Sequence, residues 1–146
     1  MNTIYFDMDG VLADFNAEPN AVERFASEKG FFFKLKTIPQ NVVALNWLVQ
    51  GNRRVKIITA SPNKNADLDK IAWVEKFLPN FDIERNMIIC RNGDTKADFV
   101  DDIENSVLFD DYGKNCREWV ASGGQAVKVK PNDKMQLLNI VVSNVY

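Results

Sequence analysis

The chain has 146 residues, of which 46% are apolar and 26% charged, enough for one globular domain and too apolar for wholesale disorder. Its formal net charge is −2 and it has no long basic run, which argues against a nucleic acid polymer as the main partner. It contains no histidine, so serine–histidine and cysteine–histidine nucleophile pairs and histidine-ligated zinc are excluded. Any general acid or base must therefore be a carboxylate, lysine, tyrosine or cysteine.

The cysteines and the hydropathy pattern indicate a cytoplasmic protein. Cys90 and Cys116 show neither a metal-ligand spacing nor a disulfide framework, which suits a reducing compartment. The first residues show no signal-peptide pattern, and no window approaches the roughly 20 apolar residues of a membrane span. We therefore expect no membrane association.

The most informative stretch runs from Ile4 to Asp14. An apolar, strand-forming run ends in Asp7 and Asp9, and Gly10 follows at once. We expect a buried parallel strand that carries Asp7 to its carboxyl end, with Asp9 on the turn and Gly10 giving the backbone freedom to bend. Ligands of open α/β sheets bind at this edge. Two neighbouring carboxylates repel each other, which is tolerable when a cation such as Mg²⁺ lies between them.

Beyond this stretch, the apolar periodicity predicts alternating strands and helices. The later strands are predicted at residues 55–59, 86–90, 107–109 and 126–129. The helices are predicted at residues 16–29, beginning near Pro19 and stopping before Gly30, and at 39–50, 66–78, 113–122 and 133–145, with a turn or short helix at 95–101. This alternation predicts an α/β fold: a Rossmann-like parallel sheet with helices on both faces, in a single domain over residues 1–146.

The connection between the first two predicted strands is longer than one crossover helix requires. About 45 residues separate Asp9 from Val55, and excess length at the ligand edge of a sheet is usually functional. We interpret residues 16–38 as a small helical cap over the site. Its run of Phe31, Phe32 and Phe33 cannot point in one direction, so we expect at least one ring to be exposed or at the site entrance. The alternative is that all three rings pack between cap and core.

Further polar residues lie at or just past predicted strand ends. Thr59 ends the second strand, Lys96 lies on the loop after the third, and Asp110 and Asp111 end the fourth. Taken singly, each has an ordinary structural explanation: a strand end, a solvated charge at a helix start, and a helix cap. Their convergence at one edge of the sheet, in the order acids, threonine, lysine, acids, favours a functional site.

In that order these residues resemble the four motifs of the haloacid dehalogenase-like (HAD) phosphatases, over nearly the whole chain. The motifs read Asp7-Met8-Asp9-Gly10-Val11, Ile57-Ile58-Thr59-Ala60-Ser61, Lys96 and Leu108-Phe109-Asp110-Asp111. Within this superfamily, Phe6 to Phe15 looks like the opening of the 5'(3')-deoxyribonucleotidases. Three other segments fit that family less tightly: Gly30-Phe31-Phe32, Thr59-Ala60-Ser61-Pro62, and Lys70 with Trp73 to Pro79. The cap predicted here is shorter than the one usual in that family, which leaves base recognition open.

The resemblance implies a Mg²⁺-dependent phosphomonoester hydrolase that forms an aspartyl-phosphate. Asp7 would be the nucleophile, and Asp9 would protonate the leaving alcohol and later deprotonate the attacking water. Mg²⁺ would bind Asp7, the backbone carbonyl of Asp9 and Asp110, with Asp111 as a weaker ligand. The phosphate would be bound by Thr59, Ser61 and Lys96, and the candidates for contact with a substrate base are Phe31, Phe32 and Phe33.

The expected partner is therefore a small-molecule phosphomonoester, with nucleoside monophosphates, and deoxyribonucleotides foremost, as the favoured substrate class. A sugar phosphate or phosphoglycolate is the alternative. The base, the choice of 5'- or 3'-phosphate and the oligomeric state, with a homodimer as one option, stay open.

Three rival functions fit the sequence less well. A receiver-type signalling domain also uses Mg²⁺, a phosphorylated Asp, a Thr and a Lys, but its acceptor Asp ends a middle strand after an N-terminal acid pair. A non-catalytic protein with this fold would not need the catalytic residue types, yet this chain has the expected residue at each of the four motifs. A polynucleotide 3'-end phosphatase is disfavoured by the acidic balance of the chain.

The remaining conspicuous residues are expected to be structural. Cys90 ends an apolar strand and should be buried. A solvated turn is expected at Asp101, Asp102 and Glu104, and core positions are expected for Trp47, Trp73 and Trp119.

Overall fold

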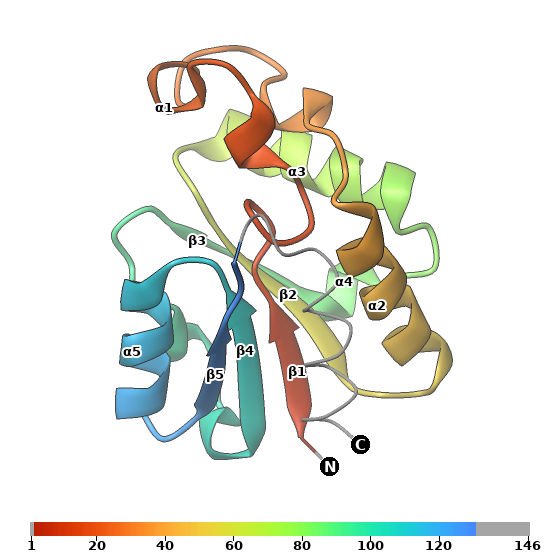
Figure 1. Ribbon diagram of the computed structural model, residues 1–146, viewed down its shortest axis with the longest axis vertical. Helices are drawn as coiled ribbons and strands as arrows, with labels where there is room; N and C mark the ends of the chain where they lie inside the picture. The colour runs from red at the N-terminus through yellow and green to blue at the C-terminus, as the bar shows by residue number, and fades with distance from the viewer. Residues whose placement is uncertain (1, 131–146) are drawn as a thin grey trace.

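The computed structural model describes residues 2–130 and is organised around one five-stranded parallel sheet. The strands are β1 (Thr3–Phe6), β2 (Val55–Ser61), β3 (Met87–Arg91), β4 (Ser106–Asp110) and β5 (Gln125–Lys128). Their spatial order is β3-β2-β1-β4-β5, so β1 lies in the middle (Figure 1). The predicted α/β class with a parallel sheet is confirmed.

Helices cover both faces of the sheet. The longer ones are α2 (Pro39–Gln50), α3 (Lys64–Phe77) and α5 (Gly113–Ala121), and the single-turn α4 (Ile83–Asn86) precedes β3. Figure 1 shows α5 on one side of the sheet and α2 and α3 on the other. Short 3-10 turns at Lys96–Phe99 and Ile103–Asn105 join β3 to β4. Among residues 2–130, no helix combines the length and apolar character needed to cross a membrane.

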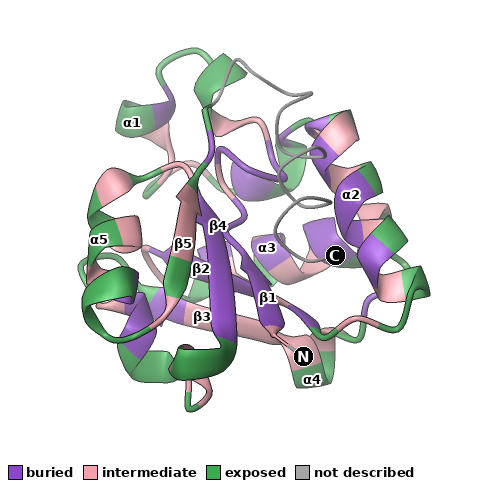
Figure 2. Ribbon diagram, turned by 60° about the horizontal axis from the view of Figure 1, so that its bottom comes forward, coloured by how far each residue is buried: buried purple, intermediate pink, exposed green. Residues whose placement is uncertain are grey.

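Successive side chains of a strand point to opposite faces of the sheet, so the sheet packs against two separate cores. Ile4 and Phe6 of β1 point into a large core with α2 and α3, whereas Tyr5 points into a smaller core with Trp119 of α5. β1 and β4 are buried along their whole length, whereas β5 at the edge is partly exposed (Figure 2). The central strand that ends at Asp7 is therefore fixed from both faces.

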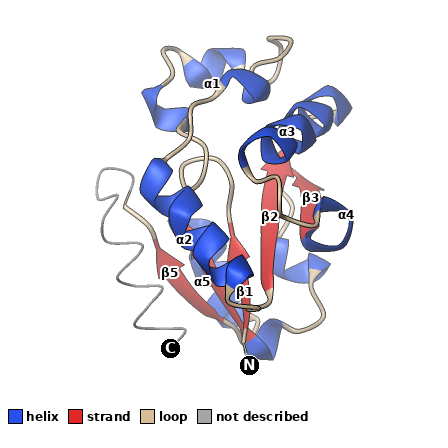
Figure 3. Ribbon diagram, turned by 90° about the vertical axis from the view of Figure 1, so that its right-hand side faces the viewer, coloured by secondary structure: helices blue, strands red, loops and turns tan. Residues whose placement is uncertain are grey.

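The segment between β1 and β2 differs from the predicted long helix. It contains a 3-10 turn (Phe15–Ala17), the single-turn α1 (Ala21–Arg24) and a second 3-10 turn (Phe32–Lys34). The expected helix over 16–29 is wrong in length because Asn20 adopts a left-handed conformation with φ 54° just before α1. Contacts of Phe25 with Phe15 and Phe32 then determine the path of this segment in place of a regular helix. α1 lies beyond the carboxyl ends of the strands, as Figure 3 shows from the side.

The other elements lie close to their predicted positions, with a few corrections. β2 continues to Ser61, two residues further than expected, and α4 was not predicted. Trp73 and Trp119 are fully buried as expected, but the prediction for Trp47 is wrong, because 45% of its surface is exposed. Cys90 is buried as predicted. The helix predicted at 133–145 lies outside the described residues.

Candidate active site

The register of the central strands brings two of the predicted acids together. Phe6 of β1 pairs with Phe109 of β4, so Asp7 and Asp110 follow side by side at the carboxyl edge of the sheet. The amide of Asp7 donates a hydrogen bond of 2.9 Å to the carbonyl of Phe109, which extends the ladder to the acid itself. Both carboxylates are buried. The pair is thus positioned by backbone pairing rather than by a flexible loop.

Lys96 joins these two acids. Its ammonium Nζ donates to Oδ1 of Asp7 and to Oδ2 of Asp110, each at 2.8 Å, and only 3% of the side chain is exposed. Burial alone would lower the pKa of Lys96, but the charges of Asp7 and Asp110 outweigh burial and raise that pKa. Lys96 therefore stays charged and offsets part of the repulsion between the acids.

A second buried lysine, Lys70 of α3, was not among the predicted site residues. Its Nζ donates to Oδ2 of Asp9 at 2.8 Å, to Oγ1 of Thr59 at 2.8 Å and to the carbonyl of Ala60 at 2.7 Å. A signal was present in the sequence: Lys70 shares a helical face with Trp73 and Val74, three and four residues on, and both are fully buried. A lysine on such an apolar face needs a buried acid as partner.

Asp111 completes the acidic group from the turn after β4. A carboxylate oxygen of Asp111 lies within 4.8 Å of one of Asp7, and the carboxyl group lies against the Cα of Gly10. A Cβ at Gly10 would fall 2.0 Å from Oδ2 of Asp111, and the φ of 85° at Gly10 is itself unfavourable for other residues. Gly10 is thus required both for the turn and for the room that Asp111 occupies.

Asp7, Asp110 and Asp111 fit a divalent cation. Each offers one carboxylate oxygen, and these atoms lie within 4.8 Å of one another, the donor type that Mg²⁺ prefers. Burial and the charge of Asp7 raise the pKa of Asp110 to about 6 and that of Asp111 to about 8. A cation between these acids would relieve the repulsion that raises both pKa values. The side chain of Asp9 is outside this group, and the expected contribution of its backbone carbonyl stays a prediction.

The two predicted hydroxyl residues are buried and contact protein groups. Thr59 is fully buried and accepts the hydrogen bond from Lys70. Ser61 is also fully buried, and its hydroxyl donates to the carbonyl of Asn63 at 3.2 Å. Their role in binding phosphate stays a prediction. Asn115 of α5, which was not predicted, donates to Oδ2 of Asp110 at 3.1 Å.

An aromatic hollow of about 210 Å³ lies beside Asp9. Its aromatic lining consists of Phe15, Phe25 and Phe32, and it is completed by Asp9, Ala60, Pro62 and Asn92. Of the three predicted base contacts, Phe31 is buried away from this hollow, Phe32 lines it, and Phe33 is 40% exposed near Lys76. Phe15 and Phe25 were missed, because nothing in their local pattern shows that the segment folds back on itself.

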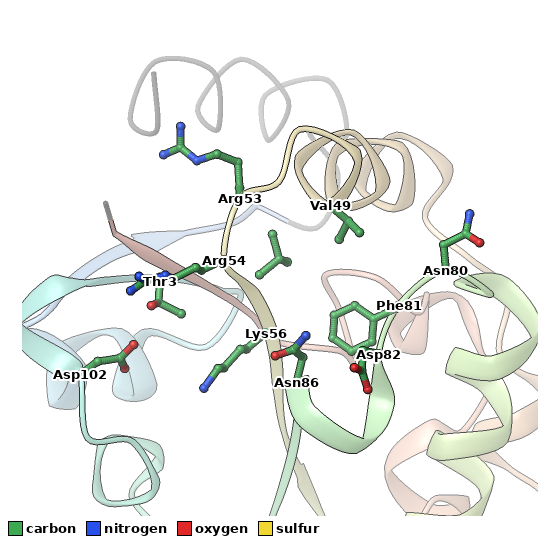
Figure 4. Close-up of a pocket in the computed structure, with 11 residues that line it drawn as sticks. Thr3, Val49, Arg53, Arg54, Lys56, Asn80, Phe81, Asp82, Asn86 and Asp102 are labelled. Atoms are coloured by element: carbon green, nitrogen blue, oxygen red, sulfur yellow. The ribbon is translucent and has the colours of Figure 1, made fainter.

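A second hollow, of about 440 Å³, lies at the opposite edge of the sheet, where β1 and β2 begin (Figure 4). Its two acids already have partners: Asp102 accepts a hydrogen bond of 2.5 Å from the hydroxyl of Tyr5, and Asp82 accepts one from the amide of Arg85. Asp102 is therefore not the solvated residue that we expected, whereas Asp101 and Glu104 are exposed. Asp7, Asp9, Asp110 and Asp111 do not line this hollow.

Comparison with known proteins agrees with the geometry of the carboxyl edge. The family model described as "5' nucleotidase, deoxy (Pyrimidine), cytosolic type C protein" matches residues 17–134. No curated protein matches the chain in sequence.

Similar folds occur among solved HAD structures. The HAD domain of the effector protein Lem4 from Legionella pneumophila is 16% identical, with a TM-score of 0.56 over 98% of this chain and 93% of that one. D,D-heptose 1,7-bisphosphate phosphatase from Burkholderia thailandensis is 12% identical, with a TM-score of 0.58 over 94% and 85%. A chain of the Pnkp1/Rnl/Hen1 complex is 15% identical, with a TM-score of 0.57, and 87% of this chain spans 45% of that longer one. These likenesses show the HAD-like fold.

The raised pKa values of the acidic group predict how Mg²⁺ binding depends on pH. The pKa is about 8 for Asp111 and about 6 for Asp110. At pH values below its pKa, each acid holds a proton that a cation must displace. Mg²⁺ should therefore raise the Tm of the protein more at about pH 9 than near pH 6. The measurement is thermal unfolding with and without Mg²⁺ at both pH values. Asp111→Asn should flatten the difference, and equal Tm shifts at both pH values would contradict this account of the site.

Proposed function

Because the chain belongs to the cytosolic type C family of deoxy (pyrimidine) 5'-nucleotidases, which are HAD-type phosphatases, we propose that it hydrolyses nucleoside monophosphates as a 5'(3')-deoxyribonucleotidase. The reaction would require Mg²⁺ and pass through an aspartyl-phosphate on Asp7. The observation that supports this most strongly is the site itself. Asp7 is fixed between Lys96 and two further acids, and Asp9, two residues further along the chain, lies at the wall of an aromatic hollow.

The chemistry proceeds in two steps that balance without an external reagent. In the first, the Asp7 carboxylate attacks phosphorus, the bond from phosphorus to the leaving oxygen breaks, and Asp9 gives that oxygen its proton. In the second, Asp9 takes a proton from water, the water oxygen attacks phosphorus, and the acyl phosphate bond to Asp7 breaks. Both steps need Asp7 and Asp9 to face the same phosphate, and the chain places Asp7 directly after β1 and Asp9 two residues further, on the turn.

Positive charge must offset the approach of a phosphate to these acids. Two unit charges of like sign at 4 Å repel by about 4 kcal/mol at an effective dielectric constant near 20. Lys96 uses two of its three N–H donors on Asp7 and Asp110, which leaves one for a phosphate oxygen. Asp7, Asp110 and Asp111 would hold Mg²⁺, which when bound neutralises charge on the acids and on the phosphate.

The aromatic hollow favours a substrate that carries a base. A flat, apolar ring would find three phenylalanine side chains beside Asp9, and stacking a base on an aromatic ring contributes about 1–3 kcal/mol in single-strand binding proteins. A sugar phosphate or phosphoglycolate has no such ring. The aromatic lining therefore supports a nucleotide over the alternative substrates.

A panel of phosphomonoesters tests this proposal. With Mg²⁺, the purified protein should release phosphate from deoxyribonucleoside monophosphates with a higher kcat/KM than from glycerol phosphate, phosphoglycolate or a sugar phosphate. A chelator and, separately, Asp7→Asn should abolish turnover, because an amide cannot attack phosphorus. A higher kcat/KM for phosphoglycolate or a sugar phosphate than for every nucleotide would favour the alternative substrate class, and full activity of Asp7→Asn would refute the mechanism.

The role of the hollow is tested by Phe25→Ala, with Phe33→Ala as the matched control. Phe25 lines the hollow, whereas Phe33 belongs to the same segment but faces Lys76. Phe25→Ala should lower kcat/KM for a nucleotide by about tenfold or more, the equivalent of one lost stacking contact, and leave p-nitrophenyl phosphate nearly unaffected. Phe33→Ala should change neither. Equal losses of Phe25→Ala on both substrates would instead assign Phe25 a packing role.

A further inference from the structure

Lys70 is a buried cation whose hydrogen-bonding capacity is fully used by the protein. Its side chain has 0% exposure, and its three N–H donors reach Asp9, Thr59 and the carbonyl of Ala60. An ammonium group has three donors, so none is left for a substrate phosphate. Lys96 differs in this respect, because within residues 2–130 only two of its three donors have partners. Lys70 thus acts on other residues of the site rather than on the substrate.

The group that Lys70 acts on is the carboxylate of Asp9. Lys70 holds Oδ2 of Asp9 at 2.8 Å, whereas Oδ1 of Asp9 is buried and has no hydrogen-bond partner among the described residues. The Asp9 side chain is 22% exposed and lies at the wall of the aromatic hollow. Lys70 is therefore the one side-chain donor, among the described residues, that fixes the orientation of this carboxylate beside the hollow.

Lys70 also touches the lining of the hollow. Its Nζ lies 4.5 Å from the ring centroid of Phe32, within the range of a cation–π contact. Phe32 belongs to the segment between β1 and β2 and lines the same hollow as Asp9. Lys70 therefore connects three parts of the site: the segment that covers the hollow, the end of β2 at Thr59 and the turn that holds Asp9.

From these contacts we propose that Lys70 is the positioning residue of Asp9, which holds the carboxylate in place at the wall of the hollow, where the leaving oxygen of the substrate would lie. This inference rests on the proposed function, because it assigns Asp9 the role of general acid. Its consequence is specific. Loss of Lys70 impairs proton transfer to the leaving group and leaves the attack by Asp7 intact, since Asp7 is held separately by Lys96.

The experiment uses two esters that differ in their need for a proton. The nucleoside of a nucleoside monophosphate is a poor leaving group as an alkoxide and requires a proton from Asp9, whereas p-nitrophenolate leaves readily without protonation. Lys70→Met should slow the single-turnover release of nucleoside by about 100-fold, the usual scale of general acid catalysis. On p-nitrophenyl phosphate the same variant should lose about fivefold or less in that step and show a burst of p-nitrophenol, because the later hydrolysis still needs Asp9 as base.

Lys76→Met is the matched control, because Lys76 lies on the same helix and over the rings of Phe33 and Phe77 but contacts no site residue. It should match the wild type on both esters. If Lys70→Met does not fold, Lys70→Gln, which keeps N–H donors at this position, is tested instead. It should slow the release of nucleoside by a smaller factor and again affect p-nitrophenyl phosphate less. Equal losses on both esters would overturn the positioning role and leave the proposed function standing, whereas a wild type inactive on both would overturn both.

Discussion

Four carboxylates meet at one edge of the sheet, and two buried lysines make that arrangement tolerable. Lys96 links the ends of β1 and β4 through Asp7 and Asp110, and Lys70 links α3 to Asp9 and the end of β2. A buried ion pair gains little net stability, because desolvation offsets much of the attraction between the charges. The two lysines are therefore best explained by what they organise: Asp7 and Asp9, the proposed nucleophile and the proposed general acid, are held separately, each by its own cation.

The fold supplies this organisation at two levels. The central position of β1 buries Asp7 and aligns it with Asp110, and the segment between β1 and β2 brings aromatic rings over the same edge. The family match begins at residue 17, so it includes most of this segment, both lysines and Asp110, whereas Asp7, Asp9 and Phe15 lie before it. The pairing of Phe6 with Phe109 places Asp7 beside Asp110, and the hydrogen bond from Lys70 fixes Asp9.

The sequence predicted those site residues whose positions follow from the apolar strands that precede them in the chain. Asp7, Lys96 and Asp110 each follow an apolar strand, so their meeting at one edge follows from a parallel sheet. Periodicity places Lys70 on a buried helical face, but it does not tell which residues its ammonium group meets. Phe15 and Phe25 depend on packing within a segment that folds back on itself, which periodicity does not report. The predicted helix at 16–29 failed for the same reason, because contacts among Phe15, Phe25 and Phe32 decide the path of that segment.

The central claim is that Asp7 carries the phosphoryl group while Asp9 handles the proton. The most direct test is to mix the protein with a nucleoside monophosphate and Mg²⁺, quench with acid within one turnover, and map the phosphate by mass spectrometry of the peptides. The account predicts an acid-stable, base-labile acyl phosphate on Asp7 and on no other residue. A phosphate found on another residue, or turnover without any covalent phosphoenzyme, would contradict it.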